Sequence, residues 1–173
     1  MTTHDTRLAA LFLAHSRNRL LEQHWPRLGE CVKPMTVEQV WWRPNEVSNS
    51  VGNLILHLNG NVTQWLVASF NRDEDKRDRP TEFSTSGGLT AVELLDRLGA
   101  TLAEADKVLD RLTVEELLAP YEIQGYQVSG LDAVYQVVEH FGLHYGQIAY
   151  IAKSLNAKDL GFYRELDKTG KAK

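Results

Sequence analysis

The chain has 173 residues, enough for one ordinary domain that buries a full hydrophobic core. Apolar residues make up 43% and charged residues 24%, and the formal net charge of −4 argues against a surface that tracks nucleic-acid phosphates. Cys31 is the only cysteine, which excludes a disulfide within the chain, and the apolar run near the start is too short to span a bilayer. We therefore expect a cytoplasmic protein that contacts neither nucleic acid nor membrane.

The first third of the chain predicts a long helix followed by a short element. Residues 1–6 are expected to be a loose terminus. Apolar residues then recur at helical spacing from Arg7 to about His24, and Pro26 and Gly29 are interpreted as stop signals. The short element follows at residues 35–42.

A second long helix is expected to begin near Ser48 or Ser50, either of which is a good N-cap, and to continue to about Phe70. Beside its apolar face runs a polar stripe. Leucine and isoleucine flank His57 in the sequence, so this imidazole is poorly placed for open solvent and needs a hydrogen-bonding partner. The stripe consists of Asn53, His57, Asn61 (or Gly60) and Gln64.

A long connection at residues 71–88 precedes the third helix. Its run of mixed charges at residues 72–79 is interpreted as a solvated loop. Thr90 then caps the third helix, with Glu93 three residues later as in a capping box.

The last third of the chain repeats part of this organisation. Residues 112–121 resemble residues 35–44, which suggests two helical hairpins related by a pseudo-twofold axis. Residues 121–130 contain two glycines and predict an extended or turn segment. The fourth helix is expected from about residue 131 to residue 156, and residues 168–173 are expected to be a loose basic tail.

The fourth helix carries a histidine pair that suggests a metal site. His140 and His144 are four residues apart and project from one face of a helix, one turn apart. Two such imidazoles can hold one divalent metal ion, although an isolated pair of this kind is also compatible with ordinary hydrogen-bonded histidines. His57 on another helix supplies a third imidazole, and three histidines leave coordination positions open, the pattern of catalytic sites.

Four long helices without a strand-rich segment predict an all-α four-helix bundle that occupies residues 1–173 as one domain. The long connection permits the second and third helices to run parallel, in an up-down-down-up order. The second and fourth helices are then antiparallel neighbours, which permits the three histidines to lie at one level. Phe141 stands where HExxH proteases place their glutamate, and no Glu-x-x-His pair occurs, so neither a zinc protease nor a ferritin-like di-iron centre is expected.

The segments around these histidines resemble the DinB-like superfamily of metal-binding four-helix bundles, and more closely an uncharacterised subfamily near the YfiT-type proteins. The resemblance spans nearly the whole chain and places His57, His140 and His144 on the ligand positions of the family. It implies one divalent ion per chain, zinc or nickel. It is carried by residues 41–45, Asn49 to Leu58, Val138 to Phe141, His144, Gly146, Gln147 and Asp159 to Tyr163.

Some members of this superfamily are metal-dependent transferases or isomerases that act with thiols such as bacillithiol, mycothiol or glutathione. The resemblance therefore implies a metal-dependent transferase that joins a low-molecular-weight thiol to an electrophilic small molecule. Asn53 and Gln147 are expected at the same end of the site, where they either orient the metal-bound ligand or are interior amides bonded to the backbone. The alternatives are a non-catalytic metal- or small-molecule-binding bundle of the stress response and a metal-hydroxide hydrolase. A homodimer is a candidate assembly.

Overall fold

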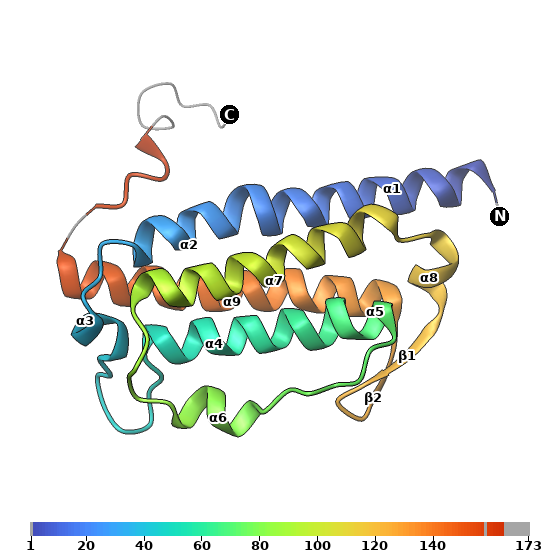
Figure 1. Cartoon of the computed structure of the whole chain (residues 1–173). Coiled ribbons are helices and arrows are strands. Elements are labelled where there is room, and N and C mark those ends of the chain that lie inside the picture. Colours follow the sequence, from blue (N-terminus) through green and yellow to red (C-terminus); the bar gives the residue numbers. More distant parts are fainter. Residues whose placement is uncertain (1, 158, 165–173) are drawn as a thin grey trace.

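The computed structural model describes residues 2–157 and 159–164, and this part of the chain is mostly helical (Figure 1). Four helical rods lie side by side and enclose one core. The first rod comprises α1 (Thr3–Arg17), the π-helical segment η1 (Asn18–His24) and α2 (Trp25–Val32). The second comprises α4 (Val51–Val62), the π-helical segment η2 (Thr63–Ala68) and α5 (Ser69–Asn71), while α7 (Ala91–Arg111) and α9 (Gly130–Asn156) are the other two.

Contacts at both ends show how the rods run. Arg111 at the end of α7 donates to the carbonyl of Phe70 in α5 at 3.1 Å. Trp41, before α4, donates to the carbonyl of Leu89, before α7, at 2.8 Å, so α4 and α7 run in the same direction. The first rod and α9 run in the opposite direction (Figure 1). In the described residues, no helix is long and apolar enough to cross a membrane.

The first rod is longer than the sequence predicted. Thr2 caps α1 in a capping box with Asp5, so residues 3–6, which were expected to be loose, are helical. The rod also continues past Pro26 and Gly29, which we had interpreted as stop signals. The π-helical turn before Trp25 shifts the helical register and places Pro26 in the first turn of α2, where its missing N–H costs little. The predicted tail at residues 168–173 lies outside the described residues.

The second and third rods begin close to where the capping signals predicted, and the fourth begins one residue before the expected start at about residue 131. Ser50 accepts from the backbone N–H of Asn53 at the start of α4, and Thr90 and Glu93 form the capping box of α7. The apolar stripes of α4 and α9 meet in the core, where Leu58, Phe141 and Ile148 are fully buried. The polar stripe that runs along α4 into η2 is also interior, since Asn53, His57, Asn61 and Gln64 are all at most 6% exposed.

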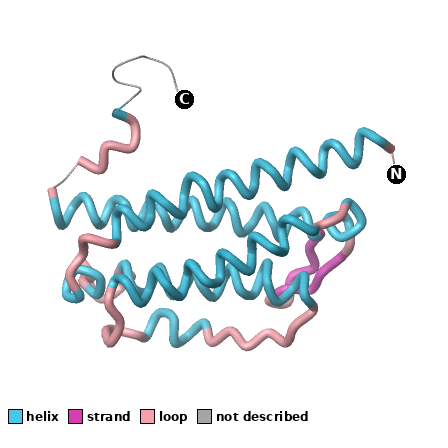
Figure 2. Tube along the Cα trace, turned by 45° about the horizontal axis from the view of Figure 1, so that its top comes forward, coloured by secondary structure: helices cyan, strands magenta, loops and turns pink. Residues whose placement is uncertain are grey.

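The connection between α5 and α7 is the largest departure from the predicted fold. The expected solvated loop instead lies along α4, and its second half forms the short helix α6 (Arg79–Ser84), capped by Asp78 (Figure 2). Arg77 and Glu82 point inward, with side chains only 4% and 8% exposed. The interpretation of residues 72–79 as a solvated loop was therefore wrong at Arg77, because packing against α4 buries it beside a carboxylate.

Two short helices, α3 (Val37–Trp41) and α8 (Val114–Leu118), precede the rods that carry the histidines. After α8 the chain forms an antiparallel hairpin of β1 (Pro120–Ile123) and β2 (Tyr126–Ser129), which confirms the predicted extended or turn segment (Figure 2). The two residues between the strands, at positions 124 and 125, have φ angles of +54° and +79°, as a tight hairpin turn requires.

Candidate metal centre

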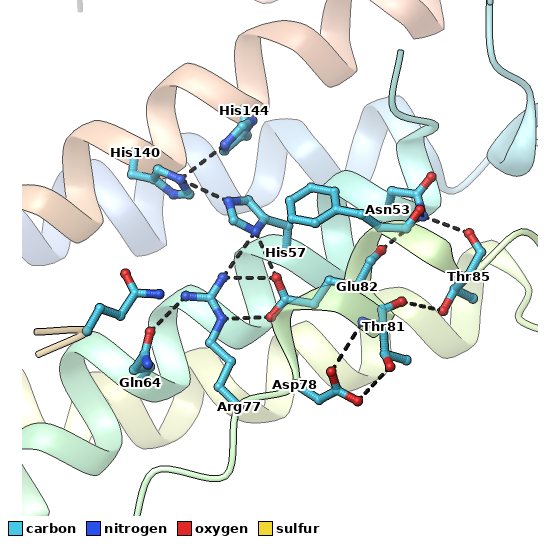
Figure 3. A network of polar contacts seen from close by, with 12 residues as sticks. Asn53, His57, Gln64, Arg77, Asp78, Thr81, Glu82, Thr85, His140 and His144 are labelled. Carbon is cyan, nitrogen blue, oxygen red and sulfur yellow. Dashed lines mark hydrogen bonds and ion pairs between the residues drawn. The ribbon is translucent and has the colours of Figure 1, made fainter. Parts of the chain in front are cut away.

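Three histidines meet between α4 and α9 (Figure 3). His57 comes from α4, and His140 and His144 come from successive turns of α9. Nε2 of His140 lies 3.1 Å from Nε2 of His57 and 3.1 Å from Nε2 of His144. The structure thus brings together the three residues that helical spacing singled out, with their ligand atoms all within 4.8 Å of one another.

The distances between the nitrogen atoms suit one shared ion. With metal–nitrogen bonds of about 2.0–2.1 Å, two imidazoles on one ion place their nitrogen atoms roughly 2.9–3.4 Å apart, depending on the coordination angle. The observed 3.1 Å separations fall within that range. An all-imidazole donor set suits zinc, nickel or copper rather than calcium or magnesium, which prefer oxygen ligands.

A buried ion pair fixes the ring of His57. Oε2 of Glu82 lies 2.8 Å from Nδ1 of His57, and Arg77 contacts both oxygen atoms of the same carboxylate at 2.7 and 2.9 Å. Nη2 of Arg77 also lies 3.1 Å from Nδ1 of His57. Because the arginine can only donate, the shorter contact with the charged carboxylate decides the tautomer. His57 therefore carries its proton on Nδ1 and presents the lone pair of Nε2 to α9.

The Arg77–Glu82 pair lies directly against the backbone of α4. Burial by itself raises the pKa of Glu82, but hydrogen bonds from Arg77 and His57 outweigh it, so the pKa lies below its usual value and the carboxylate is charged at neutral pH. Gly60 makes this packing possible, because a Cβ at this position would overlap the carboxylate and lie 2.9 Å from Nε of Arg77. Gln64 accepts a further hydrogen bond from Arg77 at 2.9 Å.

Fewer hydrogen bonds hold the rings of the two histidines of α9. Nδ1 of His144 donates to Oε1 of Gln147 at 2.8 Å, which leaves its Nε2 free of a proton as well. Nδ1 of His140 is buried and has no hydrogen-bond partner among the described residues. Burial, reinforced by neighbouring positive charge, lowers the pKa of His140 to about 3, and burial also lowers the pKa of His144. Both rings are therefore neutral near pH 7, the form that binds a metal ion.

Asn61 offers a free acceptor on the helix that faces His140. It lies one turn after His57, is 3% exposed, and its Oδ1 has no hydrogen-bond partner in the described part of the chain. If Nε2 of His140 held an ion, its ring proton would be on Nδ1, and a buried N–H there would need an acceptor. The sequence placed Asn61 on the polar stripe without assigning it a role.

Asn53 does not reach the three histidines (Figure 3). Its amide nitrogen donates to the carbonyls of Glu82 and Thr85 at 2.9 and 2.7 Å, and its Oδ1 accepts from Arg43 at 2.7 Å. Asn53 is thus an interior amide that attaches α6 to the start of α4. In this way it holds the segment that carries Glu82 rather than facing the centre itself.

Sequence reasoning missed Arg77 and Glu82, although two local signals pointed to them. Asp78 followed by Pro80 is a typical helix start, which predicts that the charged run ends in a helix instead of an open loop. Gly60, one turn beyond the expected metal ligand, is typical of a place where another group approaches the backbone closely.

Comparisons with known proteins agree with this fold. A family model described as the DinB superfamily matches residues 20–148. A conserved protein from Enterococcus faecalis, known from a crystal structure, shares 19% identity at a TM-score of 0.66, with 91% of this chain and 99% of that chain covered. The DinB-like protein YjoA from Bacillus subtilis shares 17% identity at a TM-score of 0.64, with 88% and 97% covered. No curated protein matches significantly.

Proposed function

Because this chain belongs to the DinB superfamily, we propose that it is an up-down-down-up four-helix bundle in which His57, His140 and His144 hold one divalent ion, zinc or nickel. The observation that carries the proposal is the convergence of three Nε2 atoms, with two separations of 3.1 Å. The tautomers support it, since Glu82 and Gln147 accept hydrogen bonds from Nδ1 of His57 and His144 and so leave both Nε2 lone pairs free. The closer likeness to YfiT-type proteins stays a prediction.

We further propose that the protein is a metal-dependent transferase for a low-molecular-weight thiol and an electrophilic small molecule. A divalent ion with open coordination positions lowers the pKa of a bound thiol or water and so supplies a nucleophile near neutral pH. Residues of the chain hold the rings of His57 and His144 in place, and burial keeps those of His140 and His144 neutral. His140 and His144 are only partly buried, whereas His57 is 6% exposed, so any approach to the centre is from the side of α9.

Turnover with and without a thiol separates this proposal from its alternatives. The metal-loaded protein is mixed with a panel of alkyl halides, epoxides and esters, first with glutathione or another small thiol and then without it. The transferase predicts thiol consumption that is lost in His57→Ala. Ester cleavage without any thiol favours the metal-hydroxide hydrolase instead, and no turnover of any substrate favours a non-catalytic metal-binding bundle.

A homodimer stays a prediction, and light scattering tests it.

A further inference from the structure

A second candidate site lies on the other side of α9. Successive helical residues are rotated by about 100°, so Gly142 projects away from the face that carries His140 and His144. On that side a groove of about 590 Å³ separates α9 from the first rod. The residues that line it include His24, Arg19, Arg27, Tyr135, Tyr145 and Tyr163.

His24 is the buried polar group of this groove. It is 7% exposed, and its Nδ1 is buried without a hydrogen-bond partner among the described residues. Its ring packs against Phe141 and Tyr145, with centroid distances of 6.4 and 5.5 Å. Gly142 makes room for the ring, because a Cβ there would lie 3.2 Å from Nε2 of His24. The groove therefore has a fixed, buried imidazole ring as part of its wall.

The charge of the groove favours an anion. Arg19 and Arg27 both line it, and Glu139 is the one carboxylate among its lining residues in the described chain. Burial, assisted by these two arginines, lowers the pKa of His24 to about 4, so the imidazole is neutral at pH 7 and can either donate or accept. The groove is thus locally positive on a chain whose formal net charge is −4.

The walls of the groove favour a flat ligand. Tyr135, Tyr145 and Tyr163 line it together with Phe12, and the guanidinium of Arg27 lies 5.0 Å from the centre of the Tyr163 ring. Arg19 and His24 both come from the π-helical segment η1. π-Helical turns are rare and frequently occur at functional sites. Here the turn places a cation and a buried imidazole on the same groove.

We propose that this groove binds a small aromatic carboxylate at a site separate from the histidine centre. Arg19 and Arg27 attract the carboxylate, and the tyrosine rings, together with the buried ring of His24, pack against the aromatic ring of the ligand. The binding requires no metal ion and does not depend on the proposed transferase function.

The test uses benzoate as the probe and benzamide as its uncharged counterpart. Each is titrated into the metal-free protein while backbone amide signals are followed by NMR, so that a carboxylate cannot bind an ion instead. We expect benzoate to shift signals around His24, Gly142 and Gly146 and to bind at least about fivefold more tightly than benzamide. Equal affinities, no saturation up to roughly 10 mM benzoate, or shifts confined to the region of His57 would overturn the proposal.

Gly146 provides matched variants for the same titration. No atom lies within 4 Å of a Cβ at this position, so Gly146→Ala fits the folded chain, and the side chain of Gly146→Leu starts from open space at the groove. Gly146→Leu fills the groove and should weaken benzoate binding at least about tenfold, whereas Gly146→Ala should change it at most about twofold. Arg19→Gln should weaken benzoate but not benzamide, and Arg97→Gln on α7 is its control. Benzoate binding unchanged by Gly146→Leu would contradict this location of the site.

Discussion

The two sides of the histidine centre are built in different ways. On the α4 side, His57 is 6% exposed, and its ring is held by a carboxylate 25 residues away in the sequence, which Arg77 holds in turn. On the α9 side, His140 and His144 are partly buried, and among the described residues only Gln147, from the same helix, orients one of them by a hydrogen bond from outside the centre. Helical spacing therefore suffices to place the α9 pair, whereas the orientation of His57 depends on tertiary packing.

Removing the carboxylate on the α4 side should have the largest effect. Glu82→Ala leaves the guanidinium of Arg77, which is 4% exposed, without its partner. We expect a loss of about 3–5 kcal/mol in the free energy of unfolding and a roughly 10–100-fold loss of metal affinity. Urea unfolding of the metal-free protein and competition with a chelator measure the two effects.

The double variant Arg77→Met/Glu82→Leu separates these two effects. It removes both buried charges, so the free energy of unfolding should return close to that of the parent protein, while metal affinity stays low because His57 has lost its acceptor. If the double variant binds metal as tightly as the parent, the pair serves stability alone and the proposed difference between the two sides is lost.

Acid should destabilise the metal-free protein, and His140 should account for part of this loss. Its folded pKa of about 3 lies below the unfolded value near 6.5, so the unfolded chain takes up the proton first as the pH falls. Stability is therefore complete above pH 6.5 and declines as the pH falls from 6.5 toward 3, by at most about 1.4 kcal/mol per pH unit for this residue. Urea unfolding between pH 7.5 and 5 measures the slope.

His140→Met provides the comparison for that slope. We expect this substitution to reduce, but not abolish, the dependence of the free energy of unfolding on pH. His24, whose pKa burial lowers to about 4, still contributes to that dependence. The double variant His24→Met/His140→Met should flatten it further. Identical slopes in the parent and both variants would show that neither ring is buried in its neutral form.

A methyl group at position 60 should disturb the α4 side without removing any charge. In Gly60→Ala the new Cβ overlaps the Glu82 carboxylate, so the Arg77–Glu82 pair must shift away from His57. We expect a destabilisation of about 1–3 kcal/mol and a roughly tenfold loss of metal affinity. Gly29→Ala is the control, because no atom lies within 4 Å of a Cβ there, and it should bind metal normally. Equal behaviour of the two variants would argue against a packed ion pair at Gly60.

Removing the hydrogen-bond partner on the α9 side, Gln147, should have the smallest effect on metal affinity and on stability. Gln147→Leu removes the side-chain oxygen that accepts the hydrogen bond from Nδ1 of His144. Gln147 is exposed on α9, so its replacement leaves no buried polar group without a partner. We expect metal affinity to fall by roughly three- to tenfold and the free energy of unfolding to change by less than about 0.5 kcal/mol. A loss as large as that of Glu82→Ala would mean that both sides depend equally on their outer partners.

The sequence was informative where local rules decide the structure. Capping residues and apolar periodicity predicted α4 and α9 to within one or two residues at their starts, and the spacing of His140 and His144 follows directly from the helix. Arg77 could not be recognised in this way, because its burial depends on α4 and α6 meeting around it, and its neighbours in the run are mostly exposed. The continuation past Pro26 was missed for a similar reason, since a π-helical turn leaves no simple periodic signal.

Metal content per chain tests the central claim most directly. The purified protein, reconstituted with zinc or nickel and freed of excess ion, is analysed together with His57→Ala, His140→Ala and His144→Ala, and circular dichroism confirms that each is folded. We expect about one tightly held ion per chain in the parent protein. Each single variant should be folded and metal-poor, and combining the substitutions should add little, because the loss of any ligand opens the same site. A parent protein without metal after reconstitution, or variants that keep a full equivalent, would contradict the assignment of the three histidines.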